Sequence, residues 1–175
     1  MWIAQKIFGS VCILCASWLT GHELEHRQKL RCGVLKELEE LFLYLEKEMT
    51  FHRTPMEEAF LGAAEGHTGP VKGMLQQIAG SVARRDGTMF QAIWEEAAAS
   101  WIPQGLLNAE EYQIVCGAGS ALGGTDTVMQ RVLLERQAAR FGDLAKRAAA
   151  GCEEKGRLYR RLSALAGVFL VIVLL

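Results

Sequence analysis

The segment His22-Glu23-Leu24-Glu25-His26 has the spacing of a helical zinc site. Histidines four residues apart share one face of a helix, where both imidazoles could bind Zn²⁺ while Glu23 activates a bound water molecule. This chemistry would make the chain a small membrane zinc peptidase. A charged Glu25 inside the motif, the lack of an evident third ligand and the short chain argue against it. We therefore predict no metal, no cofactor and no catalytic residue, and keep the zinc peptidase as the alternative function.

Two other patterns suggest ligand binding but have simpler explanations. Gly117-x-Gly119, followed by Gly123-Gly124, lacks the Lys-Ser/Thr of a phosphate-binding loop and follows no strand, so helix packing and a helix end explain these glycines. Trp94 and Trp101 are seven residues apart on one helical face and are expected in the core.

Apolar segments at the two ends predict membrane anchors at residues 1–21 and 162–175. The apolar run in each is about 14 residues, shorter than the roughly 20 that span a bilayer comfortably, so thinning or helix pairing would have to absorb the difference. A cleaved signal peptide is the alternative for the first segment. Basic residues flank both segments on the inner side, which predicts that residues 22–161 face the cytoplasm; they are Arg27, Lys29, Arg31, Lys155, Arg157, Arg160 and Arg161.

Residues 22–161 carry helical signals and no alternating β-branched run, so we predict an all-α, antiparallel bundle of about six helices. Polar residues with capping spacing, or a glycine followed by proline, mark the helix starts. The predicted starts are Thr54-Pro55 with Glu57, Gly69-Pro70, Thr88 with Gln91, Asn108 with Glu111, and Thr127 with Gln130.

Charge and cysteine content exclude some functions. The net charge of −1 does not favour nucleic-acid binding. Residues 131–161 are basic, with nine Lys/Arg and four Asp/Glu, and residues 23–48 are acidic, with seven acids and five bases. The two segments could therefore lie together, or both could be solvated helix faces. Five cysteines without regular spacing do not form a disulfide framework.

The chain resembles the stage III sporulation protein AB family along essentially its whole length. The matching motifs are Trp18-Leu19-Thr20-Gly21, then Leu45-Glu46-Lys47-Glu48-Met49 with Arg53-Thr54-Pro55-Met56, then Leu122-Gly123, Asp126 and Gln130, and finally Leu162-Ser163-Ala164-Leu165-Ala166-Gly167. Two features depart from the family: the histidine motif at residues 22–26, and Met56 where most members have leucine.

The resemblance implies a non-enzymatic assembly adaptor of the secretion-like channel between the mother cell and the engulfed forespore. The family is similar in fold to the cytoplasmic domain of platform protein F of type II secretion, a helical bundle. The resemblance further implies a place in the outer forespore membrane, with the bundle facing the mother-cell cytoplasm. The implied partners are a secretion-type ATPase of the same operon and other channel components, with self-association as an option.

Three places are candidate docking surfaces for such a partner. The connector Arg53-Thr54-Pro55 and the break from Gly123 to Asp126 join helices, and links between helices often display binding groups. Arg136 and Arg140 belong to the basic last helix. The alternative is that the connector and the break only shape the bundle.

Overall fold

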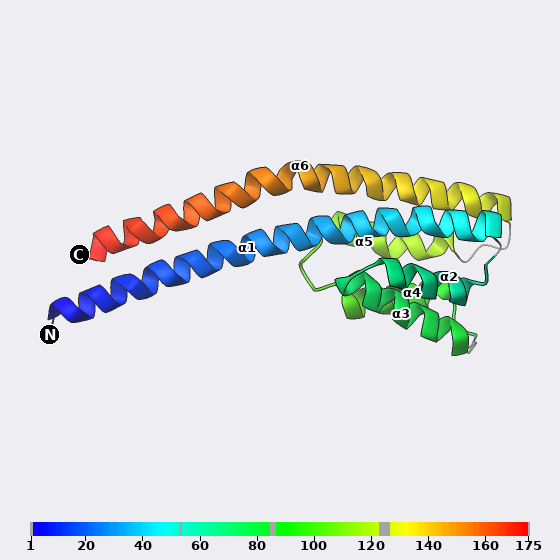
Figure 1. Ribbon diagram of the computed structural model, residues 1–175, viewed down its shortest axis with the longest axis horizontal. Helices are drawn as coiled ribbons and strands as arrows, with labels where there is room; N and C mark the ends of the chain where they lie inside the picture. The colour runs from blue at the N-terminus through cyan, green and yellow to red at the C-terminus, as the bar shows by residue number, and fades with distance from the viewer. Residues whose placement is uncertain (1, 53, 85–86, 123–126, 175) are drawn as a thin grey trace. The chain divides into compact units, whose positions relative to one another are not determined.

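The computed structural model describes residues 2–52, 54–84, 87–122 and 127–174, although side chains near both ends are outside the description. These residues form six α-helices and no strand (Figure 1), which confirms the all-α bundle. The helices are α1 Trp2–Lys47, α2 Met56–Gly66, α3 Gly69–Arg84, α4 Phe90–Trp101, α5 Ala109–Ala118 and α6 Thr127–Leu174. A π-helical turn, Glu48–His52, follows α1, and a 3₁₀ turn, Gly119–Ala121, follows α5.

The chain divides into two compact units. One contains Gly33–Lys146, and the other contains Met1–Cys32 with Arg147–Leu175. The predicted bundle, residues 22–161, extends beyond the unit Gly33–Lys146 at both ends. Across the ranges described above, no helix carries a stretch long and apolar enough to cross a membrane. The anchors at 1–21 and 162–175 stay predictions.

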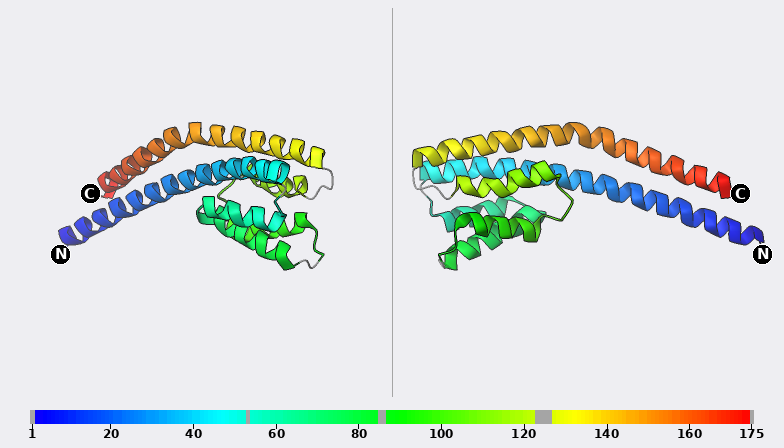
Figure 2. Two further views of the ribbon diagram at one scale, coloured as in Figure 1. Left: turned by 45° about the vertical axis from the view of Figure 1, so that its right-hand side comes forward. Right: turned by 180° about the vertical axis from the view of Figure 1, so that it is seen from behind.

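Within Gly33–Lys146, α1 and α6 pack as antiparallel neighbours (Figure 2). The rings of Phe42 and Phe141 stack, with centroids 5.3 Å apart. A pair between Glu46 and Arg131, 3.4 Å apart, joins the acidic and basic segments. An apolar stripe is buried on each helix, at Val34, Leu35, Leu38, Leu41, Phe42 and Leu45 on α1 and at Leu134, Ala138, Phe141, Ala145 and Ala148 on α6.

The aromatic core continues into the group formed by α2, α3 and α4. Phe60, Phe90 and Trp94 form one cluster, in which the ring centroid of Phe60 is 5.8 Å from that of Phe90 and 6.5 Å from that of Trp94. Trp94 is fully buried, as expected. The expectation for Trp101 is wrong, because this residue is 45% exposed. Its ring covers Gly73, and its indole N–H donates to Gln77 at 2.8 Å, so it packs against α3 from the surface.

The helix starts were predicted with mixed success. Asn108 and Glu111 form the complete capping box: each side chain accepts from the other residue's backbone N–H, at 2.8 and 3.0 Å. Thr54 does not cap α2, because its hydroxyl donates to the Glu48 carboxylate at 2.8 Å and Pro55 is the N-cap. Met89, rather than Thr88, is the N-cap of α4.

Candidate docking surfaces

The histidine motif lies on α1, where His22, Glu23 and His26 are all exposed. Glu23 pairs with Arg27 at 3.1 Å, one turn further along the helix. The ring of His22 stacks on Trp18, with centroids 6.0 Å apart. In the part of the chain that the structure describes, no three His, Cys, Asp or Glu side chains come together as a metal site. The motif therefore has two histidines one helical turn apart and a Glu23 that is already paired with Arg27.

Only some of the candidate docking residues in the connector and in the break before α6 belong to the described residues. Arg53, Gly123 and Asp126 lie outside the described residues. Thr54 has an internal role, since its backbone N–H donates to the carbonyl oxygen of Glu48 at 3.3 Å in addition to the hydroxyl contact. Pro55 is exposed at the start of α2 and has extended backbone, with φ −54° and ψ 144°. Pro55 is thus the described connector residue that a partner can reach.

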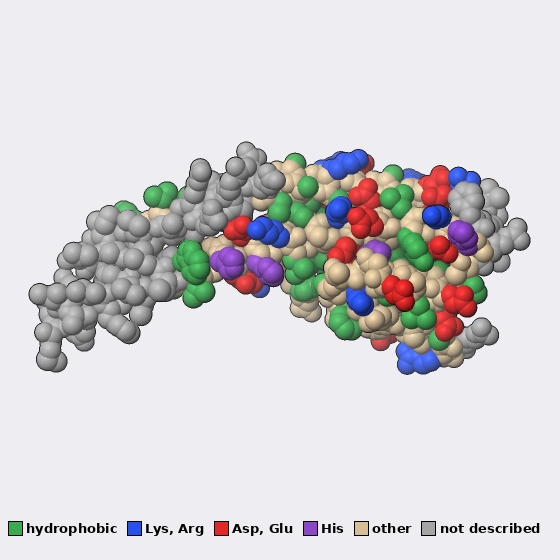
Figure 3. Space-filling view, viewed as in Figure 1, with side chains coloured by type: hydrophobic (Ala, Val, Ile, Leu, Met, Phe, Trp, Pro, Cys, Tyr) green, Lys and Arg blue, Asp and Glu red, His purple; other side chains and the backbone are tan. Residues whose placement is uncertain are grey.

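The second candidate surface is on α6, where Arg136 and Arg140 are exposed. Figure 3 shows Lys and Arg side chains along α6, with acidic side chains between them. One and two turns before Arg136, Val132 and Met129 are also exposed, at 53% and 57%. Spacings of three, four and four residues place all four on one helical face. We call this face the α6 stripe: Met129, Val132, Arg136 and Arg140. Asp143 follows it on the same face.

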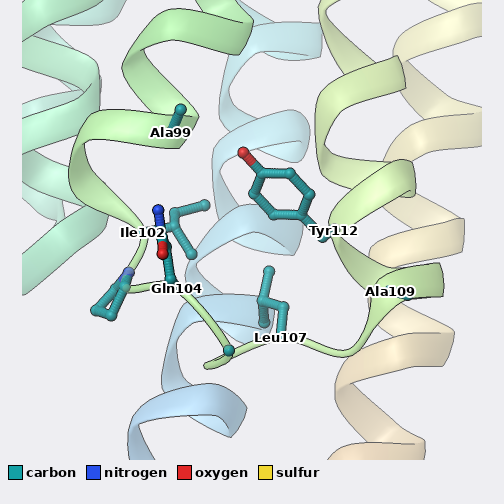
Figure 4. A pocket seen from close by; sticks show the side chains of 8 residues that line it. Ala99, Ile102, Gln104, Leu107, Ala109 and Tyr112 are labelled. Atoms are coloured by element: carbon teal, nitrogen blue, oxygen red, sulfur yellow. The ribbon is translucent and has the colours of Figure 1, made fainter.

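A cavity of about 330 Å³ lies where α4 turns into α5. The turn closes with the N–H of Leu106 donating to Pro103 at 3.1 Å, and Gly105 has φ +73°, a conformation that glycine adopts without strain. In Figure 4, Tyr112 reaches from α5 toward the end of α4, across from Ile102. The lining is Ala99, Ile102, Pro103, Gln104, Gly105, Leu107, Ala109 and Tyr112. We call this the α4–α5 cavity.

Two side-chain bonds tie α4 to α5 beyond the cavity. The indole N–H of Trp94 donates to the carbonyl oxygen of Val115 at 2.7 Å, and the Gln91 amide donates to that of Cys116 at 2.9 Å. Gly119 permits this approach, since a Cβ there would lie 2.8 Å from the Cβ of Trp94. These contacts confirm the packing role expected for this glycine and hold the two helices that line the cavity together.

The surroundings of the cavity are acidic. Burial raises the pKa of the Tyr112 phenol, and the Cys116 thiol and the Glu95 carboxylate raise it further. Burial also raises the pKa of the Cys116 thiol, the hydrogen bond with Tyr112 lowers it, and Glu95 raises it again. From residue 86 to residue 130 the sequence has six Asp/Glu and no Lys, Arg or His. The exposed acids on these two helices are Glu95, Glu96 and Glu110.

Sequence reasoning missed this cavity, although two signals were available. Pro103 and Gly105 mark a tight turn between two helices, and the long stretch without a basic residue marks a surface of one charge sign. Neither signal reveals a hollow, because its size depends on how Ile102, Leu107 and Tyr112 pack in three dimensions.

Comparisons with known proteins agree on one family. The family model for stage III sporulation protein AB matches residues 6–175. No curated protein matches the chain. A solved structure titled Stage III sporulation protein AB (SpoIIIAB) superposes with a TM-score of 0.60 at 18% identity, covering 67% of this chain and 91% of that one, which supports the fold. The family match over nearly the whole length is decisive: this chain belongs to the stage III sporulation protein AB family.

Proposed function

We propose that this sporulation-related protein is a membrane-anchored, non-enzymatic assembly adaptor of a secretion-like channel between mother cell and forespore. The observation that carries the proposal is the family match over residues 6–175. The geometry is compatible with it. The described side chains of the bundle build a packed core and display charged outer faces, and the histidine motif has no third ligand among them.

The proposed location is the outer forespore membrane, with the bundle in the mother-cell cytoplasm. Segments 1–21 and 162–175 are apolar, and the basic residues that flank them favour a cytoplasmic middle. Chemical labelling of single cysteines introduced into the bundle tests this orientation. Cysteines that react with a membrane-impermeant reagent only after the mother-cell membrane is opened would support it; reaction in intact cells would contradict it.

The proposed partner is the secretion-type ATPase of the same operon, docked at the end of the bundle where α1 leads into α2. Pro55 is exposed there, and Thr54 holds the backbone in place through two bonds to Glu48. By sequence, Arg53 belongs to this connector. Gly123 and Asp126 belong to the link that precedes α6. This surface suits a docking role because Thr54 is fixed by its own contacts with Glu48 before a partner arrives.

Co-purification of the ATPase with the full-length chain tests this docking site. Pro55→Arg should reduce the recovered ATPase roughly tenfold, as expected when a charge is forced into a packed contact. Glu58→Arg, an exposed change on the same helix, is the matched control and should retain the ATPase. If Pro55→Arg has no effect while Arg136→Glu with Arg140→Glu abolishes recovery, the ATPase docks on α6 and the connector assignment is wrong.

A further inference from the structure

Two surfaces of this chain have complementary chemistry. The α4–α5 cavity has the apolar side chains of Ile102 and Leu107 in its lining, and exposed acids occupy the helices around it. The α6 stripe presents two exposed apolar side chains followed by two exposed arginines. Each surface thus lacks what the other supplies: an apolar group to fill a hollow, and a charge of opposite sign.

We propose that the α6 stripe of one copy docks on the α4–α5 cavity of a second copy. Met129 or Val132 enters the cavity, while Arg136 and Arg140 pair with the carboxylates of α4 and α5. This contact is independent of the ATPase, and it assigns the two arginines to self-association.

The sizes and charges are consistent with this occupant. A volume of about 330 Å³ lies at the lower end of binding cavities and suits one or two aliphatic side chains. Glu95 is close enough to Tyr112 and Cys116 to act on both electrostatically, so the cavity has a carboxylate beside it. An arginine presents a planar fork of donors that matches a carboxylate, and such pairs fix the register of an interface.

The symmetry of the contact bears on the size of the assembly. Because the docking surfaces differ, a head-to-tail contact between two copies leaves one stripe and one cavity free in the pair. Such contacts close into a ring or continue as a row, whereas an isologous contact stops at a dimer. A head-to-tail assembly should therefore exceed a dimer, and the association should weaken as salt screens the exposed charges.

Charge reversal on each surface tests the proposal with full-length protein in detergent, measured by sedimentation velocity. The first variant carries Arg136→Glu and Arg140→Glu, and the second carries Glu95→Arg and Glu96→Arg. Each alone should associate roughly tenfold or more weakly than the wild type, since like charges then face each other. A mixture should associate again, because each variant's stripe then meets an opposite charge on the other's cavity.

A cavity-filling substitution tests the apolar half of the contact. Ala99 lines the cavity from α4, so Ala99→Trp should fill it and abolish association, while Ala92→Trp, an exposed change on the same helix, should not. Circular dichroism of each variant confirms that the fold is retained. A monomeric wild type, association insensitive to both reversals, or a mixture that stays dissociated would overturn the proposal.

Discussion

His67 connects the end of α2 to α1 through the backbone of Glu37. Its Nε2 is 3.0 Å from the carbonyl oxygen of Glu37, and its Nδ1 is 2.7 Å from that of Ala63. Both partners are acceptors, so the ring N–H can donate to either of these carbonyl oxygens. The side chain is only 7% exposed, and the adjacent Thr68 hydroxyl donates to the Glu37 carboxylate at 2.8 Å. The imidazole therefore fixes where α2 ends against α1.

Replacing His67 with phenylalanine should destabilise the bundle by about 1–3 kcal/mol, the usual cost of leaving a buried polar group without its partner. Phenylalanine keeps a ring in the site but removes the side-chain donor that faces these carbonyl oxygens. Urea unfolding followed by circular dichroism measures the change. His52→Phe is the control, because His52 is exposed on the π-helical turn. Equal midpoints for the two variants would show that the His67 contacts contribute nothing.

Gly73→Ala should displace the ring of Trp101. A Cβ at residue 73 would lie well inside the contact distance of that ring, and the far side of the indole faces solvent. We expect the Trp101 fluorescence to shift to longer wavelength and the unfolding midpoint to fall. Gly80→Ala on the same helix meets nothing within 4 Å and should stabilise by up to about 1 kcal/mol. A Gly73→Ala protein as stable as Gly80→Ala would contradict the packing described for Trp101.

The pH dependence of labelling at Cys116 should show that the pKa of its thiol is raised. Burial raises the pKa of this thiol above its ordinary value of 9.0. The protonated thiol therefore favours the folded state. This contribution to the free energy of unfolding is fully present below the unfolded pKa and is lost as pH rises through the folded pKa. The rate of iodoacetamide labelling at Cys116, followed by peptide mass spectrometry, should have its pH midpoint above 9.0 in folded protein and near 9.0 in denaturant.

Tyr112→Phe tests the hydrogen bond that opposes that shift. The bond from the phenol lowers the pKa of the thiol, so its removal should move the labelling midpoint to still higher pH. A midpoint that falls in this variant would contradict the donor role of Tyr112.

Purified full-length protein should contain no stoichiometric zinc. The carboxylate of Glu23 is paired with Arg27, and the described residues supply no third ligand beside His22 and His26. Elemental analysis of protein expressed with added zinc measures this directly, with the His22→Ala/His26→Ala double variant as the control. One zinc per chain that disappears in the double variant would favour the peptidase.

The sequence predicts helices well where the signal is local and poorly where distant groups compete. Asn108 and Glu111 form the expected capping box because both partners lie within one turn. Thr54 has the same local signal, but the Glu48 carboxylate on the preceding turn takes its hydroxyl, so Pro55 becomes the N-cap. The π-helical turn that places Glu48 there leaves no periodicity from which to predict it.

Burial and the site depend even more on tertiary packing. Trp94 and Trp101 share a face of α4, but Trp94 meets Phe42 and Phe60 in the core, whereas Trp101 lies at the helix end and covers Gly73. The exposed residues Arg136 and Arg140 could be identified from the basic composition of the last helix. The α4–α5 cavity could not be predicted from the sequence, because it depends on the spatial arrangement of a turn and two helices.

The most direct test of the account is the heat-resistant spore count of a deletion strain of the source organism. The strain is complemented with the wild-type gene or with the His22→Ala/His26→Ala double variant. We predict that deletion removes heat-resistant spores and that both versions restore them, as expected for a sporulation adaptor without a zinc site. A deletion strain that still forms heat-resistant spores, or restoration by the wild type alone, would contradict this account.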